Sequence, residues 1–195
     1  MDPKKYLLET ASESRHARDV FVDECGEALI LAAKRLAQCV SDGGKLLIFG
    51  NGGSAADAQH MAAEMVGRML LERPPLPAIA LTTDTSNLTA IGNDYGYDVV
   101  FLKQVEALAK PNDLILAIST SGNSKNVLIA VEKARQIGCG VISLTGGSGG
   151  KLKALSDISL NVSEGKNSCR IQETHIFAVH SIVDLLDRFF LPPRV

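Results

Sequence analysis

The sequence predicts an α/β fold, a three-layer sandwich in which helices cover both faces of a five-stranded parallel sheet. Five short apolar runs predict the strands, because continuous apolar runs are typical of parallel strands that are buried on both faces. Segments with helical spacing separate these runs, and such an alternation favours right-handed crossovers between parallel strands. The first 42 residues precede the alternation and predict a helical arm.

The composition is that of one ordinary globular domain. The chain has 195 residues, of which 46% are hydrophobic and 22% charged, so neither disorder nor a membrane protein is indicated. A net charge of −2 gives no sign of a nucleic-acid partner. The polar N-terminus lacks the apolar segment of a signal peptide and no run can span a bilayer, so a cytoplasmic location is expected. Four cysteines without a CxxC pair are expected to be reduced and buried.

The elements are expected in a simple order along the chain. In the arm (1–42), apolar residues recur at helical spacing from Phe21 to Cys39, and the helix is expected to end at Gly43. One domain is expected at 43–192, with PPRV (192–195) as a loose tail. The strands are expected at 45–50, 77–83, 113–120, 139–146 and 157–163. The helices are expected at 54–70, at 86–108 with a break near Gly92–Gly96, at 124–137 and at 169–190.

The segment STSGNS (119–124) follows the third predicted strand and opens a helix. In open parallel sheets, ligands bind beyond the carboxyl ends of the strands, where backbone N–H groups and the helix dipole favour an anion. A capping role explains Ser124 but leaves the hydroxyls of Ser119, Thr120 and Ser121 unexplained. We therefore expect a phosphate-binding loop, with a plain strand-to-helix turn as the alternative. The chain contains no GxxxxGK[ST], which argues against nucleotide triphosphates.

A second loop, GNGGS (50–54), follows the first predicted strand. Its pattern is not GxGxxG, so a dinucleotide site is not indicated. Its glycines let the backbone approach a ligand closely, and the loop is expected to contact the hydroxyls of a small polar substrate through Asn51, Gly52, Gly53 and Ser54. The alternative is a tight turn in which Ser54 caps the next helix.

Acid–base candidates lie on two predicted helices. His60 and Glu64 are one helical turn apart and could bind a divalent metal or divide acid–base work; the alternative is a solvated face on which Glu64 pairs with Arg68. In the last helix, Gln172 and His180 lie about 12 Å apart at about 1.5 Å per residue. Either Gln172 reaches over from the helix start, or a neighbouring subunit completes the site. His180 lies close to the apolar stripe, where a histidine is more often a core residue.

Together these motifs resemble the phosphoheptose isomerases of the sugar isomerase (SIS) superfamily over nearly the whole chain. The segments that carry the resemblance are GNGGSAADAQHMAAEMVGR, TAIGNDYG, STSGNS, SLTGGSGG and RIQETH followed by His180. The resemblance implies a flavodoxin-like SIS sandwich. It also implies an enediol isomerisation of sedoheptulose 7-phosphate to D-glycero-D-manno-heptose 7-phosphate, the first step toward nucleotide-activated heptose for lipopolysaccharide or other surface glycans.

The resemblance further implies roles for individual residues. Glu64 would be the catalytic base and His180 its acid–base partner. The substrate would contact Asn51, Gly52, Gly53, Glu64, Asn93, Asp94, Ser119, Thr120, Ser121, Ser124 and Gln172, with the four hydroxyl residues holding the phosphate. One zinc ion per subunit would be bound by His60, Glu64, Gln172 and His180. Members of the family are homotetramers with interfacial sites, so the arm would serve oligomerisation; no nucleic acid or membrane is implied.

Two other classes of protein remain as alternatives. The first is an SIS protein without catalytic activity that binds a sugar phosphate or the replication initiator; such a relative lacks a carboxylate at the position of Glu64, which this chain has. The second is a transcription regulator with a sugar-phosphate sensor domain. That function would need a DNA-binding module, and the arm shows no helix-turn-helix pattern. The isomerase is therefore the favoured hypothesis.

Overall fold

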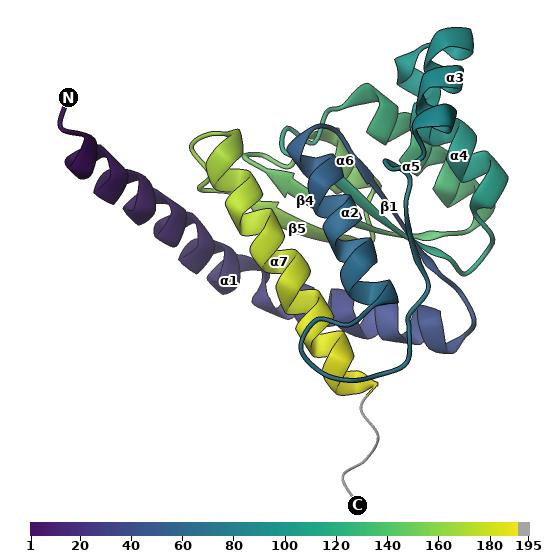
Figure 1. Cartoon of the computed structure of the whole chain (residues 1–195), viewed down its shortest axis with the longest axis horizontal. Helices are drawn as coiled ribbons and strands as arrows, with labels where there is room; N and C mark the ends of the chain where they lie inside the picture. The colour runs from purple at the N-terminus through teal and green to yellow at the C-terminus, as the bar shows by residue number, and fades with distance from the viewer. Residues whose placement is uncertain (191–195) are drawn as a thin grey trace, which may run out of the picture.

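The computed structural model describes residues 1–190 and contains a five-stranded parallel sheet between two layers of helices (Figure 1). The strands are β1 (Leu46–Gly50), β2 (Ala78–Ala80), β3 (Leu114–Ser119), β4 (Gly140–Gly146) and β5 (Ile158–Val162). The helices are α1 (Pro3–Ser41), α2 (Gly53–Val66), α3 (Thr85–Tyr95), the 3-10 turn η1 (Tyr97–Val99), α4 (Val100–Leu108), α5 (Lys125–Ile137), α6 (Gly150–Leu155) and α7 (Ser168–Phe189). The predicted fold class is confirmed. The predicted PPRV tail lies outside the described residues.

The sheet is buried on both faces, and its side chains alternate between two cores. In β1, Leu46 and Ile48 pack with α1, α2 and α7, whereas Leu47 and Phe49 pack with α4, α5 and α6. Both β1 and β3 are buried along their whole length. This double burial explains why the strands appear in the sequence as continuous apolar runs.

The strand order is β2-β1-β3-β4-β5, which is the flavodoxin-like order. The chain leaves β1 into α2 on one face of the sheet and leaves β3 into α5 on the other face. A reversal of this kind creates a crevice at the carboxyl ends of the two strands, where ligands of open α/β sheets bind. Because Gly50 pairs with Ile118, the two predicted substrate loops begin side by side at this crevice.

The helix α1 is part of the core, although its first turns extend beyond the body of the molecule (Figure 1). Its buried side chains recur at helical spacing from Ala17 to Cys39 and pack against α7 and β5. The helix ends at Ser41 and Gly43 follows with φ +80, a conformation that favours glycine. The role of this arm in oligomerisation stays a prediction.

Several local expectations differ from the structure. Ser54 does not cap α2: the cap position is Gly52, with φ +58, and Ser54 lies buried inside the first turn. Three of the four free cysteines are buried as expected, but Cys169 is exposed.

The predicted break in the 86–108 helix is confirmed, since α3 ends before Gly96, which has φ +87. Within residues 1–190, no helix has both the length and the apolar character needed to cross a membrane.

Candidate active site

The hydroxyl-rich loop joins the end of β3 to the start of α5. Ser119 is only 4% exposed, and its Oγ lies 3.0 Å from the Oγ of Ser124. The Ser121 hydroxyl accepts a hydrogen bond of 3.2 Å from the backbone N–H of Asn123, and Thr120 is half-buried between these serines. The loop thus gathers its hydroxyls at the N-terminus of a 13-residue helix, which suits an anion.

Ser124 and Gly122 occupy special positions in this loop. Ser124 occupies the cap position of α5, but its side chain makes no capping hydrogen bond; the predicted capping by its hydroxyl is therefore wrong. At Gly122 the φ angle is +64, and a Cβ atom would overlap the carbonyl oxygen of Gly149. Only glycine fits this contact, which holds the loop against the β4–α6 connection.

The GNGGS loop is held from two sides. On one side, the amide of Asn51 exchanges two hydrogen bonds of 2.9 Å with the amide of Asn126 in α5. The hydroxyl of Tyr97 also donates to Asn51 Oδ1 at 3.2 Å. On the other side, Gly53 lies against the side chain of Gln172, so close that a Cβ would be 2.6 Å from its amide nitrogen. The loop therefore contacts both α5 and α7.

Three acid–base side chains meet between α2 and α7. His60 Nε2 lies 3.2 Å from Glu64 Oε1 and 3.1 Å from His180 Nε2. The two imidazole rings meet edge to face, with 5.0 Å between their centroids. When both rings are neutral, one of the facing nitrogens donates and the other accepts. The side chains of His60 and Glu64 are 42% and 25% exposed, so the cluster can be reached by a small ligand.

This cluster corrects two expectations. Glu64 pairs with His60 rather than with Arg68, whose guanidinium lies 3.3 Å from Glu72. His180 is exposed and faces His60. The core histidine of α7 is instead His175, which is fully buried.

The other predicted site residues lie farther from the cluster. Gln172 is two helical turns before His180 on the unbroken α7, so the spacing problem seen in the sequence is real. Asn93 and Asp94 are exposed on α3, and the Asn93 amide donates to Asp94 Oδ1 at 2.8 Å. Within the described residues, neither of these two side chains hydrogen-bonds to the cluster.

Three members of the predicted zinc site, His60, Glu64 and His180, have donor atoms of the kind that zinc accepts. Zinc accepts imidazole nitrogen and carboxylate oxygen, and ligands at about 2.0–2.1 Å in a tetrahedron lie roughly 3.3 Å apart. The two separations from His60 Nε2, 3.2 Å to Glu64 and 3.1 Å to His180, are close to that value. Within residues 1–190, no group of three or more His, Cys, Asp or Glu side chains could hold a metal ion as it stands.

A carboxylate that the sequence analysis missed lies one turn before His60 on α2. Burial raises the pKa of Asp57 from 3.8 to about 6, and attraction to His60 partly offsets this effect. Among the described residues, its Oδ2 atom has no hydrogen-bond partner. The signal that could have found Asp57 is its i, i+3 spacing from His60, which places both on one face of the helix.

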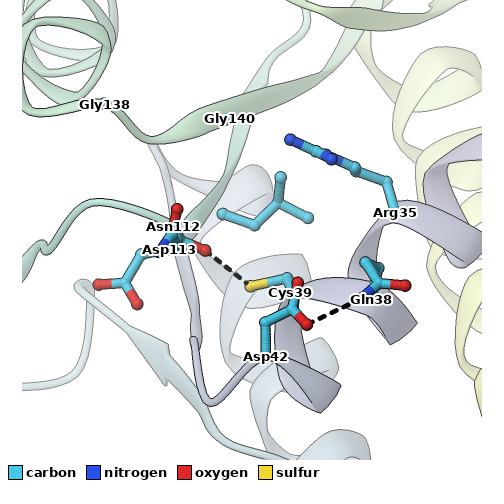
Figure 2. Close-up of a pocket in the computed structure, with 9 residues that line it drawn as sticks. Arg35, Gln38, Cys39, Asp42, Asn112, Asp113, Gly138 and Gly140 are labelled. Atoms are coloured by element: carbon cyan, nitrogen blue, oxygen red, sulfur yellow. Dashed lines mark hydrogen bonds between the residues drawn. The ribbon is translucent and has the colours of Figure 1, made fainter.

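A small cavity lies at the opposite end of the sheet (Figure 2). It has a volume of about 120 Å³ and adjoins the first residues of β3 and β4. In this cavity the Gln38 amide donates to Asp42 at 2.8 Å, and the Cys39 thiol contacts the Asn112 carbonyl at 3.3 Å. Since the predicted substrate loops follow the carboxyl ends of the strands, this cavity is separate from the candidate active site.

The buried ring of His175 predicts a loss of stability in acid. Its Nε2 donates to the Thr145 carbonyl at 3.0 Å, and burial lowers its pKa from 6.5 to about 4. Between these pH values the unfolded chain binds a proton that the folded chain does not. The contribution of His175 to the free energy of unfolding is therefore expected to fall by up to about 3 kcal/mol as the pH drops from about 6.5 to 4, while Asp57, with its raised pKa, contributes in the opposite direction.

Urea unfolding at a series of pH values checks this prediction with His175→Gln. The variant is expected to lose the part of the pH dependence between about pH 4 and 6.5 that comes from the buried ring. The control is His16→Gln on the exposed face of α1, which should leave the pH dependence of the native chain unchanged. The same pH dependence in His175→Gln and in the native chain would contradict the prediction.

Comparisons with known proteins identify the fold and the family of this chain. The SIS domain family model matches residues 11–146. The phosphoheptose isomerase of Nitratidesulfovibrio vulgaris (strain DSM 19637 / Miyazaki F) is 47% identical, over 95% of this chain and 89% of that protein. The structure of the Neisseria gonorrhoeae phosphoheptose isomerase matches with a TM-score of 0.89 and 47% identity, covering 95% of this chain and 98% of that chain.

A second solved structure extends the match. The phosphoheptose isomerase from Francisella tularensis has a TM-score of 0.92 at 41% identity, and the match covers 96% of this chain and 100% of that chain. The family model covers the two loops and α2, and the phosphoheptose isomerases match nearly the whole chain, α7 included. The chain therefore belongs to the SIS domain family and, within it, to the phosphoheptose isomerases.

Proposed function

We propose that this chain catalyses the aldose–ketose isomerisation of sedoheptulose 7-phosphate to D-glycero-D-manno-heptose 7-phosphate, the first step toward nucleotide-activated heptose. The relatives named phosphoheptose isomerases match nearly its whole length. The observation that carries the proposal is the presence in one chain of two features, an anion-binding loop at the carboxyl edge of the sheet and an acid–base cluster between α2 and α7. These are the hydroxyl-rich loop before α5 and the contact of His60 with Glu64 and His180.

The phosphate would be bound by the loop from Ser119 to Ser124. Its hydroxyls can donate to phosphate oxygens, and the N-terminus of α5 adds the favourable end of a helix dipole. The remaining sugar hydroxyls would lie toward the GNGGS loop, where Gly52 and Gly53 leave the backbone accessible. The open-chain sugar would then extend from one loop across the crevice toward α2 and α7.

The chemistry moves a proton between C1 and C2 of the open-chain sugar through an enediol. A carboxylate can take the proton from C1 of the ketose and return it at C2, and we assign this role to Glu64. His180 would move protons at the sugar oxygens. His60 Nε2 contacts both side chains, and it can carry a hydrogen toward one of them only while no zinc ion is bound to that nitrogen.

We also propose one zinc ion per subunit, held by His60, Glu64 and His180 with Gln172 as a further ligand. The donor chemistry and the two short separations from His60 Nε2 support this proposal. A bound zinc ion would polarise the sugar carbonyl and stabilise negative charge on the enediolate. The proposed homotetramer is supported by exposed apolar side chains on the first turns of α1, namely Tyr6, Leu7 and Leu8. The cytoplasmic location stays a prediction.

Turnover of sedoheptulose 7-phosphate by the purified full chain tests the proposal. Formation of heptose 7-phosphate is expected, and sedoheptulose without its phosphate should react far more slowly because it cannot use the hydroxyl-rich loop. Treatment with a chelator should reduce turnover, and added zinc should restore it. Binding of the sugar phosphate without turnover, in the presence of zinc, would contradict the isomerase and favour a protein that only binds the sugar.

A further inference from the structure

The pair formed by Asn51 and Asn126 joins the two loops of the candidate active site. Asn126 is the second residue of α5 and only 4% exposed. Each amide donates one hydrogen bond to the other and accepts one in return, both 2.9 Å long. Because the pair is largely buried, water cannot easily replace these hydrogen bonds when one partner is removed.

The Asn51–Asn126 pair lies beyond the last residues at which β1 and β3 are paired in the sheet. The pairing of β1 with β3 ends at Gly50 and Ile118. Beyond these residues the chain turns to α2 on one face of the sheet and to α5 on the other. The spacing between the sugar-binding loop and the phosphate-binding loop therefore depends on side-chain contacts, and the Asn51–Asn126 pair spans that gap.

A third predicted substrate segment is tied to the same place. The Tyr97 hydroxyl donates to Asn51 Oδ1, and Asp98 forms an ion pair of 2.7 Å with Lys125 beside Asn126. The helix α3, which carries the predicted substrate residues 93–94, has no buried residue of its own. These two contacts therefore help to hold the α3–η1 segment over the loops.

The hydrogen bonds also determine what Asn51 can offer a substrate. Its Oδ1 atom accepts from both Asn126 and Tyr97, which fills both acceptor positions of an amide oxygen. Its Nδ2 donates to Asn126, and within the described part of the chain its second N–H has no acceptor. Asn51 is thus fixed as a donor, suited to a hydroxyl oxygen of the sugar.

We propose that Asn126 is a positioning residue for the isomerisation, because it holds Asn51 and thereby sets the distance between the phosphate-binding and sugar-binding loops. A substrate anchored by its phosphate then presents C1 and C2 to Glu64. This inference rests on the proposed function. A misplacement of about 1 Å can lower a rate about 10²-fold, so loss of the pair should affect kcat more than phosphate binding.

The first test is Asn126→Ala, which removes the link without adding charge. We expect kcat to fall about 10-fold or more, while the inhibition constant of inorganic phosphate changes less than about threefold. The phosphate loop keeps its own contacts, since Ser119, Ser121 and Ser124 do not hydrogen-bond to the Asn126 side chain. Thermal unfolding of the variant, followed by circular dichroism, ensures that kcat refers to folded protein.

The second test is Asn126→Asp, which gives a signature in the pH profile. The ionised carboxylate can still accept from Asn51 Nδ2, but its second oxygen faces Asn51 Oδ1 with no hydrogen between them. Protonation restores that hydrogen and with it the pair. We therefore expect kcat of the variant, divided by kcat of the native chain at the same pH, to rise as the pH is lowered from 8 toward 5.

The matched control is Asn123→Asp, which adds the same charge to the same loop. The Asn123 side chain contacts the backbone of Ser121 and Lys151 and has no hydrogen bond to Asn51. This variant should bind phosphate more weakly, and any recovery of its relative kcat in acid should be smaller than in Asn126→Asp, because the Asn123 amide donates to the Ser121 backbone and not to Asn51.

The inference would be overturned if Asn126→Ala kept the kcat of the native chain. It would also be overturned if that variant lost kcat and inhibition by phosphate to the same extent. Equal pH profiles of relative kcat for Asn126→Asp and Asn123→Asp would overturn it as well. A native chain that does not turn over sedoheptulose 7-phosphate would instead contradict the proposed function. The two failures are therefore distinguishable, because the inference is judged on the variants relative to an active native chain.

Discussion

Replacing Glu64 by glutamine is expected to lower kcat by about 10²–10⁴-fold, the range typical of a lost general base. Glutamine has nearly the same size and can still hydrogen-bond to His60, which lies 3.2 Å away in the native chain. Its neutral amide cannot take a proton from the carbon of the sugar. The KM should change much less, because the hydroxyl-rich loop that would bind the phosphate is untouched.

Steady-state kinetics with sedoheptulose 7-phosphate check this expectation, and Glu72→Gln is the matched control. Glu72 lies just beyond α2, its side chain is 83% exposed, and among residues 1–190 its one ion pair is with Arg68 on the surface. That variant should keep the kcat of the native chain. If Glu64→Gln also kept it, Glu64 could not be the base, and the proton transfer would have to be assigned to His180 or Asp57.

The largest effect on stability is expected for Arg73→Met. The side chains of Arg73 and Asp187 are both 0% exposed, and Arg73 Nε donates to Asp187 Oδ1 at 2.8 Å. The guanidinium also donates to the backbone carbonyls of Glu64 and Met65 at the end of α2. Methionine leaves a buried carboxylate without its counter-charge, so the free energy of unfolding should fall by about 3–5 kcal/mol.

Urea unfolding at pH 7 measures this loss, with Arg188→Met as the control. Arg188 lies one residue after Asp187 and pairs with Asp184 on the surface at 3.2 Å, with its own side chain 59% exposed. Its replacement should change stability by less than about 1 kcal/mol. Equal losses in the two variants would show that the buried pair has no special role.

This buried ion pair also bears on the site. Asp187 belongs to α7 and accepts from the backbone N–H groups of Leu70 and Leu71, in the segment that follows α2. The pair therefore holds the end of α2 against α7, the two helices whose side chains form the cluster of His60, Glu64 and His180. Its charged partners are 114 residues apart, and no local pattern in the sequence relates them.

The histidines of α7 show the limit of sequence patterns for the site. Both His175 and His180 stand among apolar residues, and five positions along a helix place them about 140° apart. Which of them enters the core depends on how α7 is rotated against the sheet. The structure buries His175 under Thr145 and leaves His180 facing His60. Packing on the sheet therefore decides which of the two can reach a substrate.

By itself the sequence determined the fold class, the order of the elements and the two loops at the ends of β1 and β3. These features follow from local patterns, because burial on both faces demands continuous apolar strands and a sharp turn demands glycine. Only the tertiary structure decided which side chains meet. Asn51 and Asn126 are 75 residues apart, and His60 and His180 are 120 apart. Such contacts are set by the order of the strands and the packing of helices on the sheet, which residue spacing does not contain.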